Sequence, residues 1–95
     1  MIRHIVFFNV KDSADYDQAL AGLSLLKQNP HALRLEVQPN LRRDQLSGEI
    51  DLVVYGEFTD TEALAAYKAH PSYQHAIDLV RPIRDMRIAA DIEAG

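Results

Sequence analysis

Residues 2–10 form an apolar run rich in Ile, Val and Phe, a composition typical of a β-strand. Side chains alternate between the two faces of a strand, so the even-numbered positions share one face with His4 and the odd-numbered positions share the other with Phe7. Both faces are apolar, which predicts that the strand is covered on both sides. Residues 50–58 show the same two-sided pattern. The chain is therefore expected to contain two strands that are covered on both faces.

The segment that follows the first strand predicts an amphipathic helix. Asp15 and Gln18 stand at capping-box spacing at its start, and Asn29-Pro30 ends it. Apolar side chains recur between these limits at the i, i+4, i+7 spacing, at Tyr16, Leu20 and Leu23.

Two shorter helices are predicted on either side of Pro71. Thr59 and Glu62 stand at capping-box spacing at the start of the first one. A proline forces the residue before it out of the helical region, so this helix ends just before Pro71. The second helix then starts with Ser72 as its N-cap and ends at Pro82.

Short alternating runs at residues 33–37 and 86–92 predict two more strands, and residues 38–48 form a polar loop that we expect to be the most mobile element. The resulting order, β-α-β-β-α(α)-β, is typical of a ferredoxin-like α+β domain with an antiparallel four-stranded sheet. Such a sheet carries helices on one face only. A second copy that packs sheet to sheet would cover the other face, so we expect a homodimeric α+β barrel. Its interface should include Ile5, Phe7, Val53 and Tyr55.

Length and composition fit one globular domain, residues 1–95. Hydrophobic residues make up 47% of the chain and charged residues 25%, which are ordinary values for a folded protein. The sequence has no cysteine, which excludes a disulfide framework, thiol catalysis and thiolate metal sites. It shows no signal peptide and no run long enough to span a bilayer, so we expect a cytoplasmic location and no membrane partner.

The charge pattern argues against nucleic acid as a partner. The formal net charge is −4, and the 10 basic residues form no dense run. Arg81, Arg84 and Arg87 recur at helix-like spacing, but Pro82 and Asp85 interrupt them where a strand is expected to begin. We therefore expect no nucleic-acid partner.

The densest group of proton-bearing side chains surrounds Pro71. Tyr67 and His70 stand one helical turn apart, so both can point into the same space. A phenol beside an imidazole forms a donor–acceptor pair, and burial would lower the histidine pKa toward the range of a general base. His4 projects from the strand face that the helices should cover. Tyr67, His70 and His4 are thus the candidate catalytic residues, expected to line one cavity beneath the 59–69 helix. The candidate ligand-binding residues are Tyr73 near its mouth, Leu52, Leu64 and Ile77.

Each of these residues also has a purely structural interpretation. His70 would cap a helix end, and Tyr67 would fill the core while its hydroxyl binds a backbone carbonyl. His4 would be one of the buried histidines that serve only as hydrogen-bonded core residues.

The order of four motifs gives the chain a family resemblance. It has RHIVFFNV at residues 3–10, IDLVVYGEF at 50–58, the corner YKAHP at 67–71 and RIAADIE at 87–93. This order resembles the stress-responsive dimeric α/β-barrel domain family over nearly the whole chain. The resemblance implies the same ferredoxin-like fold and a homodimer.

A plant member of this family closes a polyketide ring without a cofactor, and its pocket is similar in part. It uses a tyrosine that matches Tyr67 together with a histidine two residues past the proline, where this chain has Tyr73. A further pocket histidine aligns with Leu52. Tyr67, His70 and His4 are retained, but the histidine that would act as base is missing. We therefore do not expect the cyclase activity.

The remaining histidines are not expected to form a metal site. His75 lies two residues beyond Tyr73, about 200° around a helix axis, which places it at the rim or in solvent. His31 is expected to be a solvated loop residue. No HExxH or paired-carboxylate pattern surrounds them, so we expect neither a metal nor another cofactor.

Three functions remain open. The first is a stress-related homodimer that binds a small, partly apolar or aromatic molecule between sheet and helices, with cofactor-free acid–base chemistry. The second is a non-catalytic structural dimer in which apolar side chains fill that space. The third, by fold analogy alone, is a cofactor-independent monooxygenase. An enclosed cavity on the order of a few hundred Å³ would favour the first.

Overall fold

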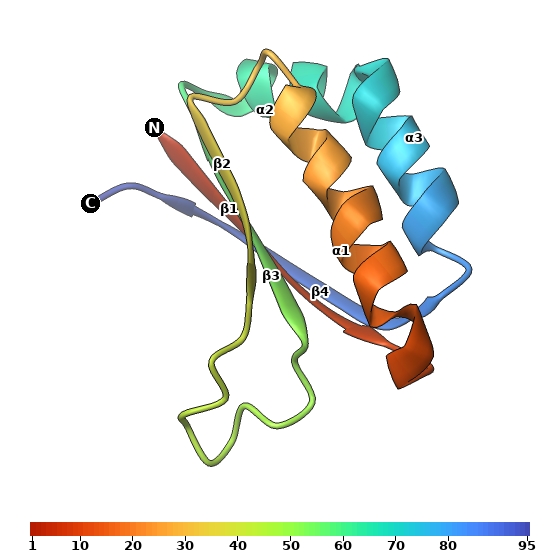
Figure 1. The fold of residues 1–95 in the computed structure, drawn as a ribbon. Helices are drawn as coiled ribbons and strands as arrows, with labels where there is room; N and C mark the ends of the chain where they lie inside the picture. Colours follow the sequence, from red (N-terminus) through yellow and green to blue (C-terminus); the bar gives the residue numbers. More distant parts are fainter.

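The computed structural model describes all 95 residues, and its element order is that of a ferredoxin-like domain. Four strands and three helices follow one another as expected, with the helical part before the last strand divided in two (Figure 1). Two short 3₁₀ segments flank the first helix. The elements are β1 (Ile2–Val10), η1 (Ser13–Asp15), α1 (Tyr16–Ser24), η2 (Leu25–Gln28), β2 (Arg34–Pro39), β3 (Leu52–Phe58), α2 (Thr61–Ala69), α3 (Pro71–Val80) and β4 (Arg84–Glu93).

The four strands form one antiparallel sheet in the order β2-β3-β1-β4. Phe7 of β1 lies opposite Val53 of β3 and Ile88 of β4. All three helices cover the same face of the sheet, and the opposite face is bare (Figure 1). The strands with apolar residues on both faces, β1 and β3, are the two central ones. We call the bare side the open face.

The core lies between the sheet and the helices. Leu52 and Val54 of β3 are 0% and 1% exposed and belong to this core, which confirms the predicted direction of the strand. Val53 and Tyr55, which alternate with them, are half-buried on the open face. The register derived from the hydrophobic pattern is therefore correct, because a slip of one residue would have exchanged the two sets.

The helix starts differ from the predicted capping boxes. Asp12, and not Asp15, provides the first capping bond, because its carboxylate accepts from the Ala14 N–H and starts the 3₁₀ turn that precedes α1. Asp60, and not Thr59, caps α2 by accepting from the Ala63 N–H at 2.8 Å. In both cases a neighbouring carboxylate is the available acceptor at the turn where the chain enters the helix.

The helical layer is held together by a close approach of α1 to α3. A Cβ atom at Gly22 of α1 would lie 2.8 Å from a methyl carbon of Val80 on α3. Only a glycine at this position lets the two helices approach so closely without a shift of Val80. The helices that roof the core are therefore fixed relative to each other.

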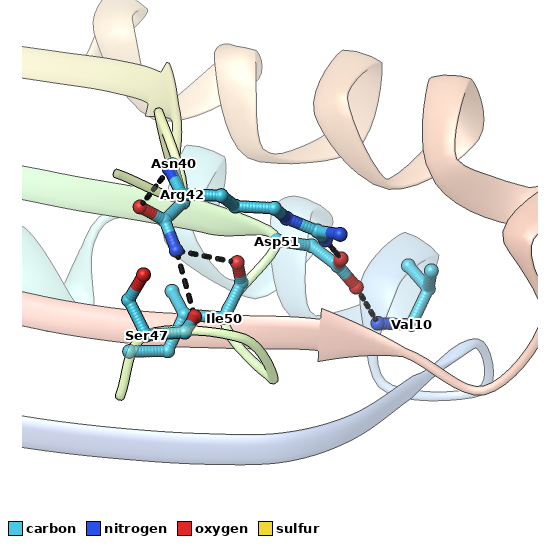
Figure 2. A network of polar contacts seen from close by, with 6 residues as sticks. All are labelled: Val10, Asn40, Arg42, Ser47, Ile50 and Asp51. Carbon is cyan, nitrogen blue, oxygen red and sulfur yellow. Dashed lines mark hydrogen bonds and ion pairs between the residues drawn. The ribbon is translucent and has the colours of Figure 1, made fainter. Parts of the chain in front are cut away.

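The polar loop between β2 and β3 is folded onto itself by a hydrogen-bond network (Figure 2). The Asn40 amide donates to the carbonyls of Ser47 and Ile50, and its oxygen accepts from the Arg42 N–H. Asp51 accepts from the Val10 N–H and pairs with Arg42. Ile50, expected in the third strand, therefore belongs to this loop, whose mobility remains a prediction.

Candidate functional site

A partly enclosed cavity of about 390 Å³ lies between the sheet and the helices. Its floor is the helix-covered face of β1 and β3, and its roof comes from the three helices and η2. Most of its lining is apolar. The polar and charged lining residues gather on two strands and two helices, and they are His4, Tyr67, Lys68, Tyr73, Arg81, Arg84 and Arg87.

Tyr67 is the largest fully buried side chain of the protein. α2 projects it onto the sheet, where its ring lies 4.9 Å from the Phe58 ring, 5.2 Å from the Tyr73 ring and 6.1 Å from the His4 ring, measured between centroids. Burial raises the pKa of its hydroxyl, and the neighbouring Tyr73 adds to this effect. Tyr67 is therefore a neutral hydrogen-bond donor and acceptor at physiological pH.

The Tyr67 hydroxyl has no hydrogen-bond partner within the protein. Tyr67 is 1% exposed, yet the only side-chain polar atom that is both sealed from solvent and unpaired is Nε of Arg3, on the open face. The Tyr67 oxygen therefore keeps some accessible surface, and this surface faces the cavity that the residue lines. The structural interpretation, in which this hydroxyl binds a backbone carbonyl, does not hold.

Asn29 fixes the end of the helix that carries Tyr67. Its side chain is 6% exposed and donates to the Tyr67 carbonyl at 2.9 Å, while its oxygen accepts from the His31 N–H at 3.0 Å. One buried amide thus adds a second hydrogen bond to the Tyr67 carbonyl, which also accepts from the His70 N–H at 3.3 Å, and it holds the turn after η2. The sequence indicated only that Asn29 precedes the proline that ends the first helix.

His4 occupies the floor of the cavity as its strand parity predicted. It is 1% exposed, and its Nδ1 lies 2.5 Å from a carboxylate oxygen of Asp91 on β4. Its other ring nitrogen, Nε2, has no protein partner and is not sealed from the cavity. Burial lowers the pKa of His4, and this effect outweighs the opposing influence of Asp91. The sequence analysis missed Asp91, whose pairing with His4 follows from the β1–β4 register.

Gly56 makes room for this arrangement on the neighbouring strand. It lies opposite His4 in the β1–β3 pair, and a Cβ atom there would approach the Phe58 ring to 2.7 Å. The absence of a side chain lets the Phe58 ring lean over Gly56 and pack edge-on near His4 and Tyr67.

His70 does not line the cavity, contrary to the expectation from its one-turn spacing to Tyr67. It is instead the N-cap of α3, because its Nδ1 accepts from the Ser72 N–H at 3.1 Å and lies 2.9 Å from the Ser72 hydroxyl. Pro71 gives His70 an extended backbone, which turns the imidazole toward the start of α3. Ser72 therefore does not cap α3, and the structural interpretation of His70 is supported.

The four candidate ligand-binding residues separate into two pairs. Tyr73 and Ile77 of α3 are half-buried and line the cavity. Leu52 and Leu64 are buried in the core and do not reach it. The two remaining histidines, His31 and His75, are exposed; the His31 ring lies 5.8 Å from that of His70.

A β-bulge places two arginines of β4 on the helix-covered face. Val10 pairs with Arg84 and Phe8 pairs with Arg87, so two residues of β1 span three of β4. Asn9 accepts from the Met86 N–H at 2.6 Å within this irregularity. Residues three apart on a regular strand point to opposite faces, and the extra residue restores Arg84 to the face of Arg87.

The model of the family described as "Stress responsive A/B Barrel Domain" matches residues 2–94. This chain belongs to that family. No curated protein matches the chain by sequence. The sequence motifs that suggested this family therefore indicated it correctly.

Solved structures of A/B barrel proteins and their relatives share the fold. A dimeric ferredoxin-like protein of unknown function from Jannaschia sp. CCS1 has a TM-score of 0.83 and 25% identity, with 98% of each chain covered. A member of the A/B barrel family from Mesorhizobium loti has a TM-score of 0.79 and 21% identity, with 99% of this chain and 97% of that chain covered. An antibiotic biosynthesis monooxygenase has a TM-score of 0.77 and 18% identity, with 100% and 99% covered.

No group of three or more His, Cys, Asp or Glu side chains is arranged to hold a metal ion. None of the helices has the length and apolar character needed to cross a membrane.

Proposed function

We propose that this A/B barrel protein is a cytoplasmic homodimer that binds a small, partly apolar or aromatic molecule in the cavity between sheet and helices. The observation that carries this proposal is the Tyr67 hydroxyl, which lies at the end of a buried ring and has no protein partner. This hydroxyl opens on the cavity and no protein group occupies its hydrogen-bonding sites, so it is free to donate to and accept from a ligand or water there.

The size and lining of the cavity support a ligand of this kind. A volume of about 390 Å³ falls in the range of small-molecule sites. The rings of Tyr67 and Tyr73 meet at 5.2 Å in an edge-on arrangement, and they present aromatic surface to a flat ligand. Leu23, Leu26 and Val80 add an apolar wall.

The pairing of His4 with Asp91 supports acid–base chemistry on the bound molecule as a second function. A carboxylate on Nδ1 holds that nitrogen as the N–H donor, so Nε2 carries the free lone pair. Because the pKa of His4 is lowered, the ring is neutral near pH 7 and can accept a proton from a ligand. Tyr67 would then donate a hydrogen bond to the oxygen on which charge develops.

Two rival functions receive less support. A purely structural dimer would fill the space beside Tyr67 with apolar side chains, whereas Leu23 and Ile77 line a cavity that stays open and Leu64 does not line it. A monooxygenase activity rests on likeness of fold alone, because the related structure is 18% identical.

Calorimetric titration with 1-naphthol tests the binding function. The unmodified protein is expected to bind it with one site per chain, and Ile77→Phe, which narrows the cavity, is expected to abolish binding. Tyr67→Phe should weaken binding about five- to tenfold, as expected for the loss of one hydrogen bond.

Tyr16→Phe is the matched control. Tyr16 packs against the core at the start of α1 but does not line the cavity, so its hydroxyl should not affect 1-naphthol binding. Equal binding by the unmodified protein, Tyr67→Phe and Ile77→Phe would contradict a ligand site in this cavity.

A further inference from the structure

The charge around the cavity is opposite to the charge of the protein as a whole. The chain carries 14 acidic and 10 basic residues, with a formal net charge of −4. The lining nevertheless contains four of the basic residues and no acidic one. These four residues come from α2, the end of α3 and β4, and they are Lys68, Arg81, Arg84 and Arg87. We call them the cationic rim.

None of the four forms an ion pair within the protein. The side-chain ion pairs involve Arg34 with Glu36, Arg42 with Asp51 and His4 with Asp91, all outside the cationic rim. Four unpaired cations around one opening produce a positive local potential there.

The fold departs from regular geometry where it builds this rim. The β-bulge at Asn9 brings Arg84 to the same face as Arg87, where a regular strand would have pointed it at the open face. Arg84 is half-buried in consequence. Bulges commonly re-aim a side chain beside a functional site.

The cationic rim continues into the polar end of the cavity. The Arg87 guanidinium donates to the Tyr73 hydroxyl at 3.4 Å, a long bond that leaves its other N–H groups free. The positive charges of Lys68 and Arg87 act on His4, and that of Arg87 also acts on Tyr67. An anionic group in this position would meet guanidinium donors and the free Tyr67 hydroxyl together.

We infer that the ligand is an amphipathic organic acid, with an apolar or aromatic body inside the cavity and one carboxylate at the cationic rim. This inference rests on the proposed binding function and adds the charge of the ligand to it. Arg84 and Arg87 are the residues that select for the acid, because a guanidinium fork binds a carboxylate through paired hydrogen bonds. Lys68 and Arg81 add attraction at longer range.

The test compares two ligands of nearly the same shape, 1-naphthaleneacetate and the uncharged 1-naphthaleneacetamide. Their dissociation constants are measured by calorimetry at low ionic strength. The unmodified protein should bind the acid about ten- to a hundredfold more tightly than the amide, the range expected for a charge-assisted hydrogen bond. Added salt should reduce this preference, because it screens the rim charges.

Arg84→Gln combined with Arg87→Gln should remove the preference and leave binding of the amide within about twofold. Lys27→Gln combined with Arg43→Gln is the matched control, since it removes the same charge from two exposed residues outside the cavity. Lys68→Gln combined with Arg81→Gln changes two exposed residues, one on α2 and one just after α3, and should reduce the preference without touching β4. This second pair of changes keeps the test valid if the change on β4 prevents folding.

Equal binding of the acid and the amide by the unmodified protein would overturn the inference and leave the cavity as a site for neutral ligands. Failure of both compounds and of 1-naphthol to bind would overturn the proposed function as well. A preference for the acid that persists in both rim variants would place the anion elsewhere and would also contradict the inference.

Discussion

Both faces of the central strands β1 and β3 carry apolar side chains, but the two faces have different surroundings. On the helix-covered face, the residues of β1 and β3 are almost all buried, and the polar side chains among them either pair or face a cavity. On the open face, Ile5, Phe7, Val53 and Tyr55 are half-buried, and Ile88 and Ile92 of β4 are 55% and 47% exposed. A single chain covers the helix-covered face completely, and it leaves the open face partly exposed to solvent.

This difference agrees with the sequence pattern, which predicted helices over one face and a second copy over the other. An exposed apolar sheet face of this kind marks a protein–protein interface. The polar loop between β2 and β3 borders it, and Leu46 of this loop is 94% exposed. Related structures are described as dimeric, which supports a second copy as the partner. In the proposed function, the open face serves assembly and the helix-covered face serves the ligand.

The largest expected effect is the loss of the dimer in Phe7→Asp. Phe7 lies at the centre of the open face, and a carboxylate buried there without a partner costs several kcal/mol. Sedimentation velocity should show a dimer for the unmodified protein at micromolar concentration and a monomer or an unfolded chain for the variant.

Gln28→Asp is the control for this change, because it adds the same charge at an exposed position on the helical side. It should sediment as the unmodified protein does. A stable monomer in the unmodified protein would show that the open face has no partner of its own kind.

The second effect concerns stability on the helix-covered face. Asn29→Ala removes a buried amide, leaves the His31 N–H without its partner and leaves the Tyr67 carbonyl with only the His70 N–H at 3.3 Å. The free energy of unfolding should fall by about 1–3 kcal/mol, the cost of buried groups left unpaired. Urea unfolding measures this, and Gln28→Ala, which removes an exposed amide from the neighbouring residue, separates it from a general effect of losing a side-chain amide.

The third effect is a dependence of stability on pH that comes from His4. Burial lowers the pKa of His4 below its ordinary value of 6.5, so just below pH 6.5 the unfolded chain binds more protons than the native protein. Stability should therefore fall as the pH falls through this window and be unaffected by His4 above it. In His4→Gln, the free energy of unfolding measured by chemical denaturation should no longer show the decrease that His4 causes below pH 6.5. His75→Gln, which removes an exposed histidine, should retain it.

The smallest expected effect is on the stability of Tyr67→Phe. The Tyr67 hydroxyl has no protein partner to lose, so the free energy of unfolding should stay within about 1–2 kcal/mol of the original. A larger loss in urea unfolding would mean that this hydroxyl is held by the protein.

The parts of the structure that the sequence predicted depend on regular alternation. The parity of β1 and β3 placed His4, Leu52 and Val54 on the helix-covered face, because a strand repeats every two residues and a slip would have reversed every side chain. The helical spacing of α2 placed Tyr67 toward the sheet in the same way, because a helix also repeats regularly. The split at Pro71 followed from the restriction that proline imposes on its neighbour.

The features that the sequence did not predict depend mostly on contacts between residues far apart in the chain. Regular alternation groups Arg84 with Met86, and only the β-bulge beside Asn9 turns Arg84 toward the helices. Asp91 meets His4 through strand pairing across almost the whole chain, which no local spacing shows. His70 was placed in the cavity because helical spacing was extended to a residue whose backbone is already non-helical.

The division of tasks between the two faces is tested most directly by NMR of the protein with labelled tyrosine rings, titrated with 1-naphthol. Tyr67 and Tyr73 report on the cavity, and Tyr55 reports on the open face. We predict that the Tyr67 and Tyr73 signals shift together along one saturation curve while the Tyr55 signal stays in place. A shift of Tyr55 with unchanged Tyr67 and Tyr73 would contradict this, because the ligand would then bind on the open face.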